Sequence, residues 1–128
     1  MIYLDSSVAL AHLFGEGRAP PASLWREPFV SSQLLEYEVW TRINARGLGE
    51  TLGDGARSMM SQVTLIELAP PVLARALAPF PVPLRTLDAL HLATIEFLRE
   101  RGQEIDLASF DKRLMAGALA LGIPLYEP

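Results

Sequence analysis

The sequence contains no cysteine. This absence excludes a disulfide framework, a thiol nucleophile and any metal site that needs cysteine ligands. A metal ion bound by this chain would therefore be a hard cation held by oxygen atoms. The 128 residues also lack an apolar run long enough to cross a bilayer, and no basic segment near the start leads into an apolar one. We therefore expect a cytoplasmic protein without a membrane segment.

Positive charge is also scarce, because 11 Lys and Arg stand against 15 Asp and Glu, which gives a net charge of −4. An acidic chain is ordinarily a poor partner for the phosphates of a nucleic acid. It would suit such a partner only if the acids surround bound cations and arginines line the approach. Half of the residues are apolar and a fifth are charged, which is typical of a globular protein. The length predicts a single domain over residues 1–128.

The hydrophobic pattern alternates between short strands and amphipathic helices. Strands are predicted at 2–5, 28–31, 63–68 and 104–110, with a short edge strand at 123–126. Helices are predicted at 8–14, within 18–27, from about 31 to 46, and at 54–62, 72–78, 86 onward and 111–122, while the glycines of 47–53 predict a turn. This order predicts a three-layer α/β fold with a central, mostly parallel sheet of four to five strands and helices on both faces.

Acidic residues lie beside the ends of several predicted elements. Asp5 follows the first strand directly, at the edge where open parallel sheets bind ligands. Asp88 lies in the first turn of a helix that Thr86 is predicted to cap, where the helix dipole favours an ionised carboxylate. Asp111 follows the strand at 104–110 and begins the last helix. Each position also suits a helix-capping acid, so none of them alone indicates a site.

Glu38 is unusual because it lies on the inward face of its predicted helix, between Leu34 and Leu35 on a helical wheel. An inward acid costs free energy unless it has a partner. The sequence offers two explanations of equal weight. Glu38 either forms an ion pair with Arg42, one turn later on the same face, or contributes to a metal site.

The predicted topology brings these acids to one edge of the sheet. Four converging carboxylates would repel one another unless cations lay between them. Mg²⁺ and Mn²⁺ are the natural candidates, because both prefer oxygen ligands and keep bound water available for chemistry. Two such ions can activate water and stabilise the leaving oxygen of a phosphodiester.

Several short segments together resemble a known family. They are 3–7 (YLDSS), 31–32 (SS) followed by Glu38, 87–93 (LDALHLA), 109–114 (SFDKRL) and 122–125 (GIPL). In order and spacing they resemble the PIN-domain family, and more narrowly the VapC-type toxins of bacterial and archaeal toxin–antitoxin pairs. The likeness extends over nearly the whole chain.

The resemblance implies a magnesium-dependent endoribonuclease, usually a homodimer, that is inhibited by a small cognate antitoxin. It implies that metal-activated water attacks the phosphorus of RNA while the metal neutralises the departing 3′ oxygen, with Mn²⁺ as an alternative ion. One or two ions would be bound. The residues that the resemblance assigns to the metal and to catalysis are Asp5, Glu38, Asp88 and Asp111.

Hydroxyl and basic side chains complete the site that the resemblance implies. Ser109 stands where the family more often has threonine, and this substitution keeps the oxygen atom. Ser6 and Ser109 would orient the acidic ligands. The candidates for binding RNA phosphates are Arg42, Arg85, Lys112 and Arg113, although each also suits a solvated surface charge or an ion pair.

Three other functions compete with this interpretation. A serine hydrolase would pair Ser6 or Ser7 with His12 or His91, but no Gly-x-Ser-x-Gly motif is present, and the apolar surroundings of His91 favour a packed side chain. A phosphatase with an aspartyl nucleophile would carry a second acid at position 7, where this chain has serine. A PIN-like module that binds RNA or protein without cleavage is disfavoured because all four acids are present.

An apolar edge is predicted on or near the helix of Glu38. Tyr37, Trp40 and Leu48 form it. Such residues usually belong to the core. If they were exposed, they would suit a dimer contact or an antitoxin segment.

Overall fold

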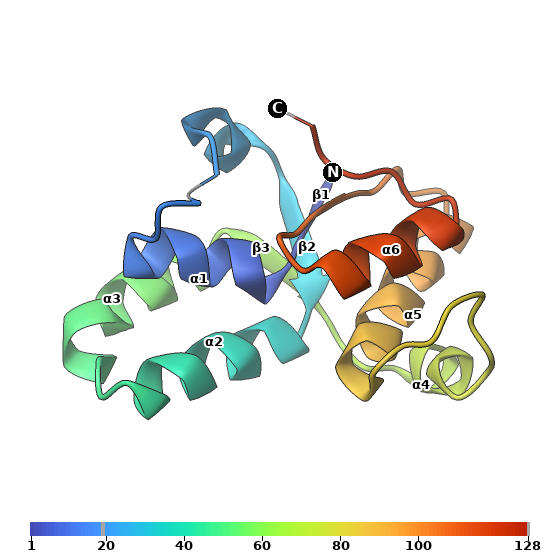
Figure 1. The fold of residues 1–128 in the computed structure, drawn as a ribbon, viewed down its shortest axis with the longest axis horizontal. Helices are drawn as coiled ribbons and strands as arrows, with labels where there is room; N and C mark the ends of the chain where they lie inside the picture. The colour runs from blue at the N-terminus through green and yellow to red at the C-terminus, as the bar shows by residue number, and fades with distance from the viewer. Residues whose placement is uncertain (19, 128) are drawn as a thin grey trace.

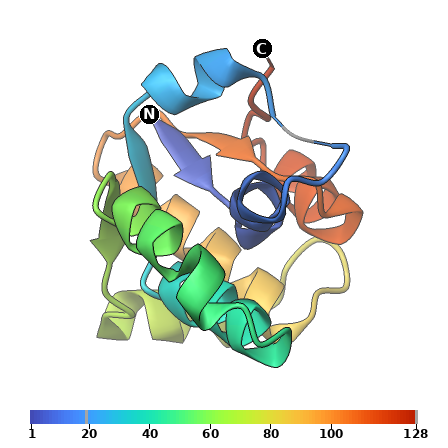
Figure 2. The ribbon, with the colours of Figure 1, turned by 90° about the vertical axis from the view of Figure 1, so that its left-hand side faces the viewer.

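The computed structural model describes residues 1–18 and 20–127. Its centre is a parallel sheet of β1 (Ile2–Leu4), β2 (Phe29–Ser32), β3 (Val63–Ile66) and β4 (Asp106–Ala108), in the order β3-β2-β1-β4. Figure 2 shows β1 between β2 and β4. Because the chain passes to one side of β1 first and to its other side only at β4, the carboxyl ends of these two strands lie at a topological switch point, where such sheets bind ligands.

Helices cover both faces of the sheet, as the sequence predicts (Figure 1). On one side lie α1 (Ser6–Phe14), α2 (Leu34–Ala45) and α3 (Gly49–Met60). On the other lie α4 (Pro70–Ala76), α5 (Thr86–Glu100) and α6 (Lys112–Ala120). A short 3₁₀ helix, η1 (Ala22–Arg26), leads into β2. None of the helices in the described residues is both long and apolar enough to cross a membrane.

Alternating side chains divide the core into two layers. Ile2, Leu4 and Phe29 belong to the apolar cluster beneath α1, α2 and α3. Tyr3 and Val30 belong to the second cluster, with residues of α5 and α6. A parallel strand that is buried on both faces needs apolar residues at odd and even positions alike, which explains the consecutive apolar residues of β1 and of the first half of β2.

The largest differences from the predicted elements concern α3 and the expected last strand, while the ends of β3, β4 and α4 differ by two residues. The segment 47–53 is a turn only at its beginning, because Gly47 has a φ of 66° whereas α3 already begins at Gly49. Glycine in a helix costs about 1 kcal/mol relative to alanine, but buried Ala56, Met59 and Met60 attach α3 to the core, and this packing outweighs the low propensity. The expected strand at 123–126 is reduced to one bridge between Leu107 and Leu125, so the sheet has four strands among the described residues.

Close packing of α5 against α6 fixes the two helices whose first turns carry Asp88 and Asp111. Gly117 lies at this contact, where an added Cβ would lie 2.7 Å from Cδ1 of Leu92 and 2.9 Å from Cδ2 of Leu84. The absent side chain therefore allows the helices to approach.

The α5–α6 contact predicts that alanine substitution has opposite effects on stability at two helical glycines. Gly55→Ala, in α3, would meet only Cδ2 of Leu13 at 3.6 Å, so it is expected to raise the free energy of unfolding by about 0.5–1 kcal/mol. Gly117→Ala gains the same helix propensity but overpacks the α5–α6 contact, at a cost of about 1–3 kcal/mol. Urea unfolding followed by circular dichroism should therefore rank Gly117→Ala below Gly55→Ala; equal stability of the two variants would contradict the close contact.

Candidate active site

An open pocket of about 610 Å³ lies at the carboxyl edge of the sheet. Its walls come from the end of β1, the first turns of α1 and α5, the middle of α2 and the residue before α6. The pocket brings together all four acids singled out in the sequence. Its lining residues are Asp5, Ser6, Ser7, Leu10, Glu38, Arg42, Arg85, Thr86, Leu87, Asp88, His91 and Asp111.

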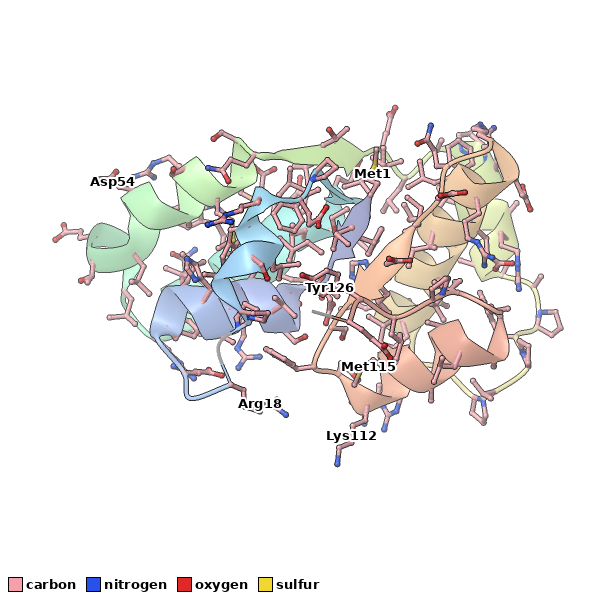
Figure 3. All side chains as sticks on the ribbon, turned by 90° about the horizontal axis from the view of Figure 1, so that it is seen from above. Met1, Arg18, Asp54, Lys112, Met115 and Tyr126 are labelled. Carbon is pink, nitrogen blue, oxygen red and sulfur yellow. The ribbon has the colours of Figure 1, made fainter. Side chains whose placement is uncertain are left out.

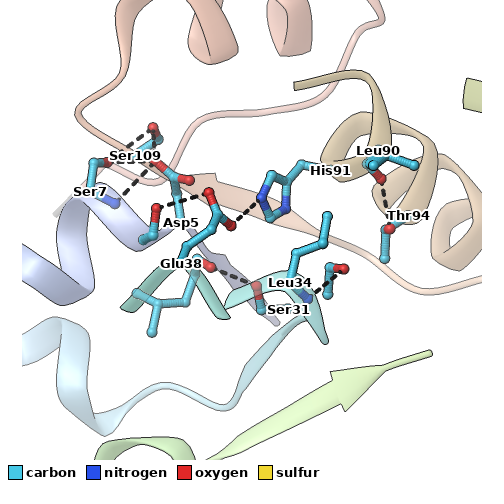
Figure 4. A network of polar contacts seen from close by, with 12 residues as sticks. Asp5, Ser7, Ser31, Leu34, Glu38, Leu90, His91, Thr94 and Ser109 are labelled. Carbon is cyan, nitrogen blue, oxygen red and sulfur yellow. Dashed lines mark hydrogen bonds and ion pairs between the residues drawn. The ribbon is translucent and has the colours of Figure 1, made fainter. Parts of the chain in front are cut away.

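Asp5 is the most constrained of the acids (Figure 4). It caps α1, and its Oδ2 accepts hydrogen bonds from Oγ of Ser7 at 2.5 Å and from Oγ of Ser109 at 2.8 Å. Only 5% of Asp5 is exposed. Burial raises the pKa of Asp5, although these hydrogen bonds and the nearby His91 act in the opposite direction.

Asp111 is tied to Asp5 through Ser109. The Oγ of Ser109 donates to Asp5 and accepts the backbone N–H of Asp111 at 2.9 Å. Asp111 in turn caps α6, because its Oδ1 accepts the N–H groups of Arg113 at 2.9 Å and Leu114 at 3.2 Å. The capping role and the place in the pocket therefore coexist in one exposed side chain.

Asp88 approaches the same pocket from α5. It is 9% exposed, and its Oδ2 accepts the backbone N–H of Arg85 at 3.4 Å. Thr86 was expected to cap this helix, but it is the first helical residue, and Arg85 occupies the capping position. The carboxylate of Asp88 therefore accepts a backbone N–H group at the start of α5 that has no partner within the helix.

Glu38 has a partner that its position in the sequence does not predict. Its Oε1 accepts a hydrogen bond from Nε2 of His91 at 2.7 Å, and its Oε2 accepts one from Oγ of Ser6 at 3.3 Å. The alternative ion pair with Arg42 is therefore wrong, since the ion pairs of the described residues do not include one between these two side chains. Arg42 instead lines the pocket.

Tyr3, Ser7 and His91 are the polar residues that sequence reasoning missed or dismissed. His91 is 2% exposed, and its Nδ1 lies 2.7 Å from Oη of Tyr3, which is fully buried. A signal was present, because Tyr3 is the one phenol in an otherwise aliphatic strand, two residues before Asp5 and on the same side of the pleat. His91 follows Asp88 by one turn, so both lie on the same face of α5.

The charge state of His91 reflects its surroundings. Burial alone would lower the pKa of this imidazole. The hydrogen bond and charge of Glu38, with the charges of Asp5 and Asp88, outweigh burial and raise the pKa of His91 overall. Burial also raises the pKa of Tyr3, which therefore remains a neutral phenol.

The predicted basic residues differ in position. Arg42 and Arg85 are exposed and line the pocket. Lys112 and Arg113 are exposed in the first turn of α6, beside Asp111 in the chain but outside the pocket lining, and Lys112 projects outward (Figure 3). Within residues 1–18 and 20–127, the salt bridges present involve none of these four side chains.

The contacts do not support a serine hydrolase. Ser7 donates its hydroxyl hydrogen to Asp5 and Ser6 donates to Glu38, so neither is activated by a histidine. His91 contacts Glu38 and Tyr3, and the ring of His12 lies 4.5 Å from that of Trp25. A nucleophilic serine needs a base within hydrogen-bond distance, and in the described residues no Ser–His hydrogen bond meets this requirement.

The chemistry of the donor set suits a hard cation. Asp5, Asp88 and Asp111 each use one oxygen in a turn or cap, and the other oxygen has no hydrogen bond to the described protein. No group of three or more acidic or histidine side chains among the described residues has metal-binding geometry. The residues fit Mg²⁺ or Mn²⁺ by the type of their donor atoms.

The buried carboxylate predicts a trade-off between stability and function. A carboxylate whose pKa is raised by folding destabilises the folded state at pH values above both its folded and unfolded pKa, and this cost disappears below the unfolded pKa. Asp5→Asn is therefore expected to raise the melting temperature of chelator-treated protein by a few degrees at pH 7, with the gain lost near pH 3. Scanning calorimetry at both pH values measures it, and Glu67→Gln, which removes an exposed negative charge, is the matched control. No gain at neutral pH would show that burial of Asp5 is not costly.

Comparisons with known proteins agree with this geometry. Residues 2–118 match the family described as PIN domain. The chain is 32% identical to Ribonuclease VapC46 of Mycobacterium tuberculosis strain ATCC 25618 / H37Rv, over 99% of this chain and 97% of that protein. It is 26% identical to Ribonuclease VapC47 of strain CDC 1551 / Oshkosh, over 100% and 97%. A structure titled as a toxin–antitoxin complex from Klebsiella pneumoniae shares the fold, with a TM-score of 0.69, 19% identity and 94% of each chain covered. The chain therefore belongs to the PIN-domain family, among its VapC-type members.

Proposed function

We propose that this protein is a metal-dependent endoribonuclease, the toxin of a toxin–antitoxin pair. One observation carries the proposal: four carboxylates from four separate segments line a single pocket, and three of them present an oxygen that has no hydrogen bond to the part of the chain that the structure describes. The names of the two mycobacterial relatives, both ribonucleases, support it.

Asp5, Glu38, Asp88 and Asp111 would hold one or two Mg²⁺ or Mn²⁺ ions directly or through water. When bound, such an ion lowers the pKa of water and withdraws charge from a phosphodiester oxygen. The chain supplies the orientation of the acids. Ser7 and Ser109 both donate to Oδ2 of Asp5, which leaves Oδ1 available to a ligand.

The rim of the pocket fits a polyanionic substrate better than the acidic composition suggests. Arg42 and Arg85 reach the pocket from α2 and from the residue before α5. We assign phosphate contacts to these two residues, and weaker contacts to Lys112 and Arg113 outside the lining. Leu10 and Leu87 provide an apolar wall that limits water around the scissile bond.

An antitoxin segment fits the surface beside the pocket. Tyr37 is 65% exposed, whereas Trp40 and Leu48 pack partly against the core. Tyr37 helps to line a second hollow of about 370 Å³, which shares Ser6, Glu38 and Arg42 with the acidic pocket. A peptide bound along Tyr37 would therefore extend to the acids and block access of RNA.

Cleavage of RNA tests the proposal. We expect the purified protein to cleave single-stranded RNA in Mg²⁺ or Mn²⁺ and to lose activity in EDTA. Asp5→Asn should lower the rate by more than about 100-fold, because it removes a ligand rather than a supporting contact, for which losses of 10–100-fold are typical. Asp106→Asn, an acid near the opposite end of β4 and outside the pocket lining, should retain activity.

The outcomes separate the competing functions. Full activity of Asp5→Asn would show that the acids are not the catalytic centre. RNA binding without cleavage in either metal would favour a binding module. Because Asp5→Asn is expected to be folded, its inactivity would not reflect unfolding.

We also propose that the protein forms a homodimer through α4. Leu77 is 90% exposed and Leu73 is 43% exposed, and both line an open apolar hollow of about 520 Å³ with Leu84, Ala89 and Leu90 of the following segment. A contiguous apolar surface of this kind is costly to leave in water and typical of an interface.

Light scattering tests the dimer. At micromolar concentration we expect twice the mass of the chain, and Leu77→Asp should yield monomer because it places a charge in the contact. Leu119→Asp changes a 61% exposed leucine on α6 and serves as the control. A monomeric wild-type protein, or dissociation by both variants alike, would contradict the α4 interface.

A further inference from the structure

A chain of hydrogen bonds runs from the backbone of β2 to the carboxylate of Glu38. The N–H of Ser32 donates to Oη of Tyr3 at 3.1 Å, and Oη lies 2.7 Å from Nδ1 of His91. The Nε2 of His91 lies 2.7 Å from Oε1 of Glu38, the contact drawn in Figure 4. Tyr3 is 0% exposed and His91 is 2% exposed. The chain therefore links the sheet, α5 and α2 inside the core.

The direction of these hydrogen bonds follows from the donors. The Ser32 N–H donates to Oη of Tyr3, so a neutral His91 can accept the phenol hydrogen at Nδ1, whereas a protonated His91 carries a hydrogen on Nδ1 and donates it to Oη. A neutral imidazole then carries its hydrogen on Nε2, and a protonated imidazole carries one there as well. In both states Nε2–H donates to Glu38, so the contact does not depend on the charge of His91.

The two oxygens of Glu38 are held unequally. The bond from His91 to Oε1 is short, whereas the bond from Ser6 to Oε2 is 3.3 Å long and therefore weak. A carboxylate oxygen with one weak hydrogen bond retains the capacity to bind another ligand. The hydrogen-bond chain from Ser32 through Tyr3 and His91 to Glu38, called the relay below, thus fixes Oε1 of the carboxylate and leaves Oε2 available to the pocket.

We propose that His91, held in place by Tyr3, is a positioning residue that orients Glu38 for metal binding. The proposal rests on the metal-dependent nuclease proposed above. It accounts for a buried polar cluster that structural stability alone does not require, because apolar side chains in place of the whole cluster would fill the core without the cost of burying polar groups.

The test measures metal affinity rather than activity alone. Isothermal titration of Mn²⁺ into the full-length protein should give a dissociation constant about 10–100-fold higher for His91→Leu than for wild type. His91→Gln keeps an N–H donor at similar reach and should recover most of the affinity. Tyr3→Phe removes only the hydroxyl that orients the ring, and it should give an intermediate loss.

Thr94→Val is the matched control. Thr94 is also fully buried on α5, one turn after His91, but its hydroxyl donates to the carbonyl of Leu90 rather than to a pocket residue. Its Mn²⁺ affinity should equal that of wild type even if its stability falls. In RNA cleavage, His91→Leu should lower kcat with little change in KM, and excess Mn²⁺ should restore part of the rate.

Each outcome decides a different question. Wild-type Mn²⁺ affinity in both Tyr3→Phe and His91→Leu would overturn the relay while leaving the nuclease intact. Equal losses in Thr94→Val and Tyr3→Phe would mean that core packing, not orientation of Glu38, is responsible. If wild type cleaves no RNA and binds no Mn²⁺, the proposed function and the relay fail together. Circular dichroism confirms folding, and Tyr3→Phe keeps the test valid if His91→Leu does not fold.

Discussion

The pairing of β1 with β4 is the constraint on which the candidate site depends. Leu4 lies opposite Ala108, and the N–H of Asp5 continues the ladder by donating to the carbonyl of Ala108 at 3.0 Å. Ser109, the next residue, can therefore donate to Asp5. One strand register thus joins two acids that are more than a hundred residues apart, and a slip of one residue would turn Asp5 away from the pocket.

Placing charges at this edge opposes the stability of the fold. Apolar burial on both faces of the sheet favours folding, whereas desolvation of Asp5 and mutual repulsion of the acids oppose it. The chain reduces this cost by giving each acid a local partner: hydroxyls for Asp5, backbone N–H groups for Asp88 and Asp111, and an imidazole for Glu38. These partners are compatible with a ligand because most of them engage only one carboxylate oxygen.

The sequence predicted the alternation of strands and helices because helices cover both faces of the sheet. Each element is then buried in a regular pattern, and the spacing of its apolar residues reveals that pattern. The sequence also identified the four acids, since each stands beside an element boundary or on an inward helix face. It did not predict the partner of Glu38, because helical spacing compares only residues of the same helix, whereas His91 lies on another helix 53 residues away. For the same reason, the start of α3 depends on tertiary contacts of Met59 and Met60 that outweigh the low helix propensity of its glycines.

The acidic composition, which at first argues against a nucleic-acid partner, has a specific origin. Without the four pocket acids, the remaining 11 Asp and Glu equal the 11 Lys and Arg, so the net charge of −4 equals the charge of the pocket alone. A neutral body exerts little long-range attraction or repulsion on RNA, and screening at physiological salt weakens both further. Under the proposed function, affinity for RNA would then arise locally, from cations bound between the acids and from Arg42 and Arg85 at the rim. Substrate binding and catalysis would therefore both depend on filling the same acidic pocket with metal, which links RNA affinity to the orientation of four carboxylates.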